Sequence, residues 1–186
     1  MSWTTPKTWT AGNTLTAAEL NEQVRDNLTF LNAKPSDIYV LNEASDYSTT
    51  SSTFVDVDGT NLSLSITTGG GDLLVWFSGT VAADAGVPAY IYLDVDVNGS
   101  RIGGDDGVVM VASNTGGVIS QYQGDKWKNI VLLRLLSGLG AGTHTLSLQW
   151  KVLGTSGATA RLYAGAGTAI AYGSVDIHPQ FGVREL

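Results

Sequence analysis

Cysteine is absent from the sequence, and positive charge is scarce: Lys and Arg number 10 against 17 Asp and Glu, which gives a net charge of −7. Without cysteine the chain has no disulfides, thiolate metal sites or cysteine nucleophiles, so its stability must come from burial or from association. With so little positive charge, no basic surface is available to neutralise phosphates. The composition therefore predicts no nucleic-acid binding.

Long apolar runs and a secretion signal are also missing. No uninterrupted apolar segment approaches about 18 residues, and the N-terminus shows no basic region followed by an apolar stretch. We therefore expect a soluble protein with no cleavable signal and no membrane insertion. A hydrophobic fraction of 43% with 15% charged residues excludes intrinsic disorder, so the chain should fold compactly.

Glycine, by contrast, is abundant, at 23 of 186 residues, often beside Thr, Ser, Asn or Asp. Glycine at such short intervals is typical of a fold with many strands joined by tight turns. From residue 38 onward apolar and polar residues alternate, and the clearest predicted strands are 38–41, 62–67, 73–81, 90–97, 130–136, 144–152, 160–164 and 174–183. The sequence predicts a mainly β protein, an antiparallel, jelly-roll-like β-sandwich over residues 37–186.

Two of the predicted strands are apolar on both faces. In residues 62–67 and 143–150 apolar residues alternate with hydroxyl or amide residues, which indicates one buried and one wet face. Residues 73–77 and 130–136 lack this alternation, so part of one sheet should carry a second apolar surface. In a sandwich such a surface commonly becomes an interface between subunits.

A short N-terminal α-helix is predicted over residues 14–33, which contain no glycine and carry apolar residues at helical spacing. Thr16 and Glu19 have the spacing of a capping box, which specifies the start of the helix. Pro35 ends it. We therefore expect residues 1–36 to form an arm and an amphipathic helix that are distinct from the β-rich body.

The predicted helix carries an apolar stripe that must be covered, because a helix of this length is marginal alone in water. The stripe consists of Ala17, Leu20, Val24, Leu28 and Leu31. Read as heptads, the successive core positions are Ala17, Leu20, Val24, Asn27 and Leu31, and Asn27 is the single polar residue that would set the register of a short coiled coil. The leading prediction is self-association through this stripe. The alternative is a helix that docks against its own β-rich body.

The segment that most resembles a metal site is the run from Asp94 through Asp96 and Asn98, with Asp105 at the twelfth position of a calcium-loop pattern. The same run also alternates like a strand, and Asn98 followed by Gly99 is a strong two-residue hairpin signal. We therefore expect a hairpin without calcium, and no cofactor elsewhere.

Catalytic constellations are weak in this sequence. The two histidines, His144 and His178, lie in alternating strand patterns without a further ligand at metal spacing beside them, so a structural role is expected. A nucleophile elbow of the Gly-x-Ser-x-Gly type is absent. We expect a protein that is not an enzyme.

A carbohydrate-directed function is the main alternative. Asp56 with Asp58, or Asp105 with Asp106, could supply the paired carboxylates of a glycosidase, although both pairs lie in turn-like segments where acidic residues are common. A sugar platform could use aromatic side chains, although rings on strands are more often core or interface residues. The candidates are Trp76, Trp127, Trp150, Tyr90, Tyr92 and Tyr122.

Three segments of the sequence are informative when they are taken together. They are WTAGNTLTAAELN at residues 9–21 with RDNL at 25–28, LGAGTHTL at 139–146, and FGVREL at 181–186. Together they resemble small structural proteins of tailed bacteriophages and prophages. The segments lie in the helix and in the sandwich, so the resemblance covers nearly the whole chain, and it transfers no catalytic residue.

The resemblance implies an exposed, often trimeric virion protein that is assembled in the host cytoplasm and attached through its N-terminal segment. Trp3 and Trp9 are costly to leave in water, at roughly 25 cal/mol for each Å² of apolar surface, so we expect them to insert into another virion protein or a neighbouring subunit. Tail fibre or tail tip, capsid decoration and internal baseplate are the competing roles. A host-surface glycan or protein is a further candidate partner, and a carbohydrate-binding or carbohydrate-active module is the rival function.

Overall fold

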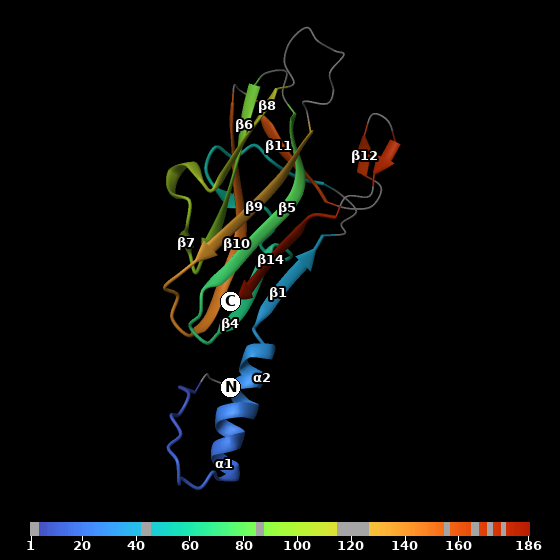
Figure 1. Ribbon diagram of the computed structural model, residues 1–186. Helices are drawn as coiled ribbons and strands as arrows, with labels where there is room; N and C mark the ends of the chain where they lie inside the picture. The colour runs from blue at the N-terminus through green and yellow to red at the C-terminus, as the bar shows by residue number, and fades with distance from the viewer. Residues whose placement is uncertain are drawn as a thin grey trace.

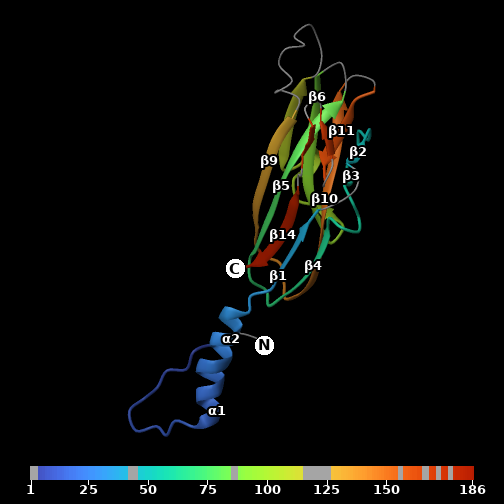
Figure 2. The ribbon, with the colours of Figure 1, turned by 90° about the vertical axis from the view of Figure 1, so that its right-hand side faces the viewer.

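The computed structural model describes residues 4–41, 46–84, 88–114, 127–154, 157–164, 168–170, 173–175 and 178–186. Two antiparallel sheets pack face to face, and a helix extends from one end of the resulting sandwich (Figures 1 and 2). In the described part of the chain, we find no helix with the length and apolar character needed to cross a membrane.

Sheet A holds β1, β14, β5, β11 and β2 in that order, and β9 pairs with the other side of β5. Their bounds are β1 Ser36–Val40, β2 Tyr47–Thr49, β5 Leu73–Asp84, β9 Trp127–Leu136, β11 Thr159–Tyr163 and β14 Gln180–Glu185. Sheet B is centred on β10 and β6, with β3 and β4 beside β10 and with β7 and β8 beside β6. Their bounds are β3 Val55–Asp56, β4 Ser63–Thr68, β6 Pro88–Val97, β7 Ser100–Arg101, β8 Val109–Asn114 and β10 Gly142–Gly154.

The order of the long strands is that of a jelly roll. Sheet A contains the order β1-β14-β5-β9 and sheet B contains β4-β10-β6-β8, so in each sheet strands that are far apart in the chain lie side by side. Two further strands, β12 Thr168–Ile170 and β13 Gly173–Val175, pair only with each other. The predicted antiparallel β-sandwich with one N-terminal helix is confirmed.

The core lies between the two sheets and is built by strict alternation. In β5 the inward side chains of Leu73, Val75 and Phe77 are fully buried, and in β10 the inward Leu148 and Trp150 are buried to 0% and 1% exposure. Each such side chain contributes about 1.5–3 kcal/mol relative to an exposed one. This alternation fixes which residues of each strand point outward.

The predicted strands agree with the observed ones except at the C-terminus. Residues 174–183 were expected to form one strand, whereas the structure has β13 ending at Val175 and β14 beginning at Gln180. Pro179 lies just before β14 and has no N–H to give to a sheet, which explains why a single strand does not run through this segment. The carbonyl of Pro179 accepts a hydrogen bond from Leu41 N at 2.8 Å.

The helix begins after Thr16, as predicted, with both hydrogen bonds of the capping box present. It consists of α1 Ala17–Leu20, a π-helical segment Asn21–Asp26 and α2 Asn27–Asn32. A π-helical turn holds more residues than an α-turn, so it changes the angular spacing of side chains along the helix. The predicted heptad register, which assumes an uninterrupted α-helix, therefore does not continue through this segment.

Candidate functional site

The helix projects away from the sandwich and leaves its apolar stripe uncovered (Figures 1 and 2). Leu20, Val24, Leu28 and Leu31 are 48%, 47%, 60% and 54% exposed. At the end next to the sandwich, the ring of Phe30 lies close to Gly69, where an added Cβ would be 3.4 Å from Phe30 Cε2. The alternative in which the stripe docks against its own β-rich body does not hold in this structure.

Asn27 lies beneath the N-terminal arm rather than on the exposed side of the helix, and it is only 5% exposed. Its amide makes a paired contact with Thr4: Thr4 N donates to Asn27 Oδ1 at 2.9 Å, and Asn27 Nδ2 donates to Thr4 O at 3.0 Å. Asn27 thus holds the arm against the helix, a role that its place in the heptad pattern did not indicate.

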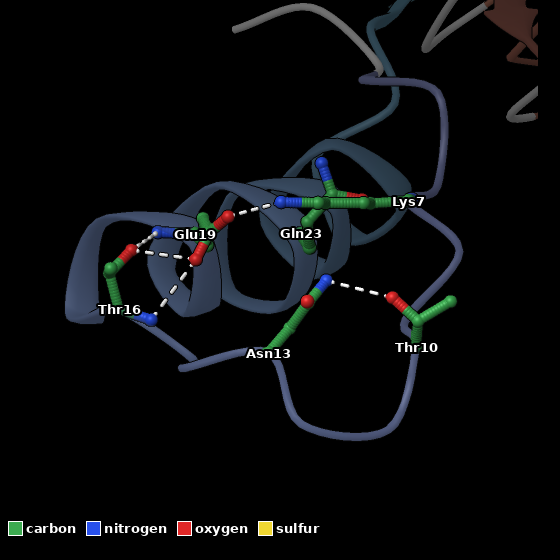
Figure 3. Close-up of polar contacts among 6 residues, drawn as sticks. All are labelled: Lys7, Thr10, Asn13, Thr16, Glu19 and Gln23. Carbon is green, nitrogen blue, oxygen red and sulfur yellow. Dashed lines mark hydrogen bonds and ion pairs between the residues drawn. The ribbon is translucent and has the colours of Figure 1, made fainter.

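A second contact of the arm involves Lys7 (Figure 3). Lys7 Nζ donates to Glu19 in an ion pair, and Lys7 N donates to Gln23 Oε1 at 2.7 Å. The hydrogen bond from Lys7, with those from Thr16, lowers the pKa of Glu19 to about 2. Since this folded-state pKa lies below the ordinary value, the contact contributes at neutral pH and is lost only as the pH falls toward 2.

The two tryptophans predicted to attach the protein both lie in the arm. Trp9 is 44% exposed, and Lys7 Nζ lies 5.1 Å from the centroid of its ring. Trp3 lies outside the described residues. Because hydrogen bonds from Thr4 and Lys7 hold the arm along the helix, Trp9 and the apolar stripe belong to one projecting unit.

Glu185 fixes the base from which this unit projects. Its buried carboxylate accepts hydrogen bonds from Gly69 N at 3.0 Å and from Gly71 N at 2.8 Å. Glu185 N also donates to Pro35 O at 2.9 Å, which ties the residue before β1 to the last strand. These bonds join the C-terminal strand, the turn after β4 and the end of the helical segment.

A second uncovered apolar surface lies on the outer side of sheet A. Directly paired residues place side chains in rows across β1, β14, β5 and β9, and the central row is Ile38, Gly182, Trp76 and Leu133. The flanking rows add Leu74 with Leu135, and Val40 with Val131. We call the set Ile38, Val40, Leu74, Trp76, Val131, Leu133 and Leu135 the apolar face.

The exposure of the apolar face is greatest on the edge strand β9. Val131, Leu133 and Leu135 are 72%, 63% and 52% exposed, and on β1 Ile38 and Val40 are 51% and 45% exposed. The sequence-based expectation that residues 73–77 and 130–136 give part of one sheet a second apolar surface is confirmed. The pairing of β14 with both β1 and β5 adds Ile38 and Val40, which sequence periodicity did not assign to this surface.

Gly182 allows Trp76 to lie flat in the middle of this face. A Cβ added at Gly182 would be 2.2 Å from Trp76 Cζ2, so any side chain there would displace the indole ring. The signal for this arrangement was present in the sequence, because an isolated glycine within a strand often marks a close approach by another group.

The outer side of sheet B is chemically different. Along β4 and β10 it carries hydroxyl pairs: Ser63 Oγ lies 3.1 Å from Ser147 Oγ, and Thr67 Oγ1 lies 2.9 Å from Thr143 Oγ1. The two outer surfaces of the sandwich therefore differ in polarity, and only that of sheet A carries the apolar face.

The predicted hairpin at Asn98 and Gly99 is confirmed, with φ values of 55° and 86° that suit the two central residues of a type I′ turn. Asp94 lies on the outward side of β6, in alternation with the buried Leu93 and Val95, but it is itself fully buried by the segment after the hairpin. Its Oδ1 accepts hydrogen bonds from Val95 N at 2.8 Å and from Gly103 N at 2.9 Å, and Arg101 lies 3.3 Å from Oδ2.

The other weak calcium candidates are also bound within the chain. Asp96 Oδ1 accepts from Gly99 N at 2.7 Å, and Asn98 Oδ1 accepts from Thr145 N at 3.0 Å. Asp105 is exposed, and its backbone oxygen accepts from Lys151 Nζ at 2.5 Å. In the described segments we find no group of three or more His, Asp or Glu side chains positioned to hold a metal ion.

We predict that calcium chelation leaves the melting temperature unchanged, because N–H groups of the protein already occupy the oxygens of Asp94, Asp96 and Asn98. Thermal unfolding monitored by circular dichroism, with calcium and with excess chelator, checks this. A fall of several degrees on chelation would contradict it and would make these residues and Asp105 the first ligands to test.

We predict that Asp94→Ala destabilises the fold by about 2–4 kcal/mol, because it leaves two backbone N–H groups without an acceptor. Asp94→Asn keeps an oxygen for these groups and should cost less than about 1 kcal/mol. Burial raises the pKa of Asp94. The contribution of this carboxyl to the stability of the fold is therefore full below its ordinary pKa near 4, and it declines as the pH rises through the raised pKa.

Chemical denaturation of the wild type and both variants between pH 4 and 7 measures these effects. The stability of the wild type should fall relative to Asp94→Asn as the pH rises. Equal losses of stability in Asp94→Ala and Asp94→Asn would contradict this account of the buried carboxyl. A wild type whose stability rises relative to that of Asp94→Asn as the pH rises would also contradict it.

The remaining candidates for chemistry are held in structural contacts. His144 lies between Asn98 Nδ2 and Gly140 O, each 2.9 Å from a ring nitrogen, and His178 Nδ1 lies 2.9 Å from Leu41 O. Asp58 accepts hydrogen bonds from Tyr47 and from the turn that follows it, which lower its pKa although burial acts to raise it.

The structure does not assemble the predicted sugar platform from its described aromatic residues. Trp150 is in the core, Trp76 belongs to the apolar face, and Tyr90 and Tyr92 lie on the outer side of sheet B. Tyr122 and the side chain of Trp127 lie outside the described part of the chain.

No protein-family model matches this sequence, and a search of curated proteins gives no match. Among solved structures, the chain is similar to dimeric latent PorU from Porphyromonas gingivalis, with a TM-score of 0.37 and 13% sequence identity. The similarity covers 82% of this chain and only 13% of that chain, so this chain spans a small part of the length of PorU.

Proposed function

We propose that this protein is a non-enzymatic structural protein of a bacteriophage virion, exposed on the particle as a tail-tip, fibre or capsid decoration protein. It works as a homotrimer, in which the arm and helix provide self-association and attachment, and the sandwich projects outward. The phrases at residues 9–28, 139–146 and 181–186 suggest the virion class. The observation that carries the proposal is the projecting helix with its uncovered apolar stripe.

The physical argument concerns what such a helix requires. Its 16 helical residues include a π-helical segment, and isolated helices of this length are marginal in water. Four apolar side chains of the stripe are each close to half exposed or more. Cover from other copies of the chain removes this surface from water and gives the sandwich a stalk.

The arm supports an attachment role for the same unit. Contacts from Asn27, Glu19 and Gln23 hold it along the helix, so Trp9 is presented at a fixed place. An aromatic ring that is 44% exposed can anchor a contact with another virion protein. The body keeps its histidines and buried carboxylates in structural hydrogen bonds, which suits a protein without catalysis.

Electron microscopy of assembled particles, with the chain carrying a tag recognised by an antibody, tests the location. Labels should appear on the outer surface of the particle, and Trp9→Ala should lower incorporation without lowering the melting temperature of the body. Particles that carry no copies of the chain would contradict the proposal. Full incorporation of Trp9→Ala would place the attachment surface elsewhere.

A host-surface ligand is the second part of the proposal. Tyr90, which is 42% exposed, and Met110, which is 54% exposed, lie on the outer side of sheet B. A glycan array combined with an assay for released reducing sugar separates the candidate functions. Binding without release fits a virion adhesin, whereas release of sugar would contradict a non-enzymatic protein and favour a carbohydrate-active module.

A further inference from the structure

The apolar face of sheet A lies in the half of the body next to the helix. Its three rows begin at Ser36, only a few residues after the end of α2, and they cross β14 and β5 to the end of β9 (Figure 1). Farther from the helix, the outer side of the same sheet becomes polar, where Thr80 Oγ1 donates to Asn129 Oδ1 at 2.7 Å. The outer side of sheet A is therefore apolar near the helix and more polar farther from it.

We propose that the apolar face packs against a second copy of this chain, so that the outer side of sheet A lies inside the assembly and sheet B faces outward. This inference rests on the proposed self-association through the helix, and it extends the contact into the body. A stalk of parallel helices brings the bodies together at their helix-proximal ends, which is where the apolar face lies.

The charge of the face fits contact between identical chains. Each copy carries a net charge of −7, so an interface between copies should avoid acidic side chains. The three rows contain neither Asp nor Glu, and their one charged residue is Arg184, at the margin nearest the helix. A face of this composition brings no carboxylates of neighbouring copies together.

The size and shape of the face also fit. Five aliphatic side chains, between 45% and 72% exposed, lie with Trp76 on adjacent paired strands, and Gln180 and Ser78 lie between Val40 and Val131 in the third row. Patches of about 300–600 Å² on monomers are often functional, and a standard interface needs roughly 800 Å² from each partner, so we expect the face and the helix stripe to be buried together. Gly182 keeps the centre of the face flat because it lets Trp76 lie across β14.

The absence of cysteine makes a direct test possible, because one introduced thiol reports on one position. Leu133→Cys places it in the central row of the apolar face, on the edge strand β9, and Thr145→Cys places it at an exposed, outward position on sheet B as the matched control. In the purified full chain, the Leu133→Cys thiol should react with a maleimide at least ten times more slowly than the Thr145→Cys thiol. Adding Leu20→Asp and Val24→Asp should remove most of that difference.

Light scattering on the same samples distinguishes the possible failures. An oligomer in which both thiols react equally fast would overturn the packing of sheet A against a second copy, while self-association through the helix would stand. A monomer with two fast thiols would overturn both. A further variant, Leu133→Lys, should weaken association at least tenfold, whereas Thr145→Lys should leave it unchanged, and equal affinities would also count against the proposed interface.

Discussion

The double substitution Leu20→Asp, Val24→Asp should convert the proposed trimer into a monomer at micromolar concentration. Both side chains are nearly half exposed in the single chain, and in an assembly they would lie between helices. A carboxylate buried without a partner costs several kcal/mol, and the trimer would bury six of them near its axis. The loss should exceed the binding energy that a short helical stalk can provide.

Light scattering across a range of concentrations measures this loss, and Glu22→Ala is the matched control. Glu22 is exposed on the same helix, and its removal takes away charge without placing any in the stripe. Far-UV circular dichroism should show the same β content in all three proteins. A monomeric wild type, or a double variant that still forms trimers, would mean that the stripe is covered by something other than copies of the chain.

Deletion of residues 1–33 should leave a folded, soluble β-sandwich that is no longer incorporated into particles. The structure places this cut before Pro35, whose carbonyl accepts a hydrogen bond from Glu185 N and therefore belongs to the body. The stripe contributes little to the body because its side chains do not reach the sandwich core. The main contact that is lost is that of Phe30 near Gly69, so the melting temperature should change by only a few degrees.

Thermal unfolding and a particle incorporation assay check this prediction together. The matched control is the full-length Trp9→Ala variant, which removes one anchor and keeps the helix. An insoluble or unfolded truncation would show that the helix stabilises the sandwich. A truncation that is incorporated normally would show that attachment depends on the body.

Local features of the sequence predicted much of the fold. The capping box of Thr16 and Glu19 specified the start of the helix, and Asn98 with Gly99 specified the hairpin, because each depends on residues a few positions apart. The strands were predicted from the alternation of apolar and polar residues, because this alternation indicates which side chains are buried. The π-helical segment was not predicted, since the spacing of apolar residues within it also fits an α-helix.

The candidate surfaces were predicted only in part. Periodicity showed that residues 73–77 and 130–136 are apolar on both sides, but it could not show that β1 lies in the same sheet. The role of Asn27 depends on Thr4, which is 23 positions away. The burial of Asp94 depends on the segment after the hairpin, which folds back over it and brings Gly103 N within 2.9 Å.

The sequence by itself determined the elements: a capped amphipathic helix, the inward and outward residues of the long strands, and the absence of cysteine chemistry. These follow from hydrogen bonding and burial over short spans of chain. Only the tertiary structure decided that Ile38, Trp76 and Leu133 form one row with Gly182 between them, and that the helix stands clear of the sandwich. Pairing between strands far apart in the chain depends on how the whole jelly roll closes, and no local pattern of residues encodes that choice.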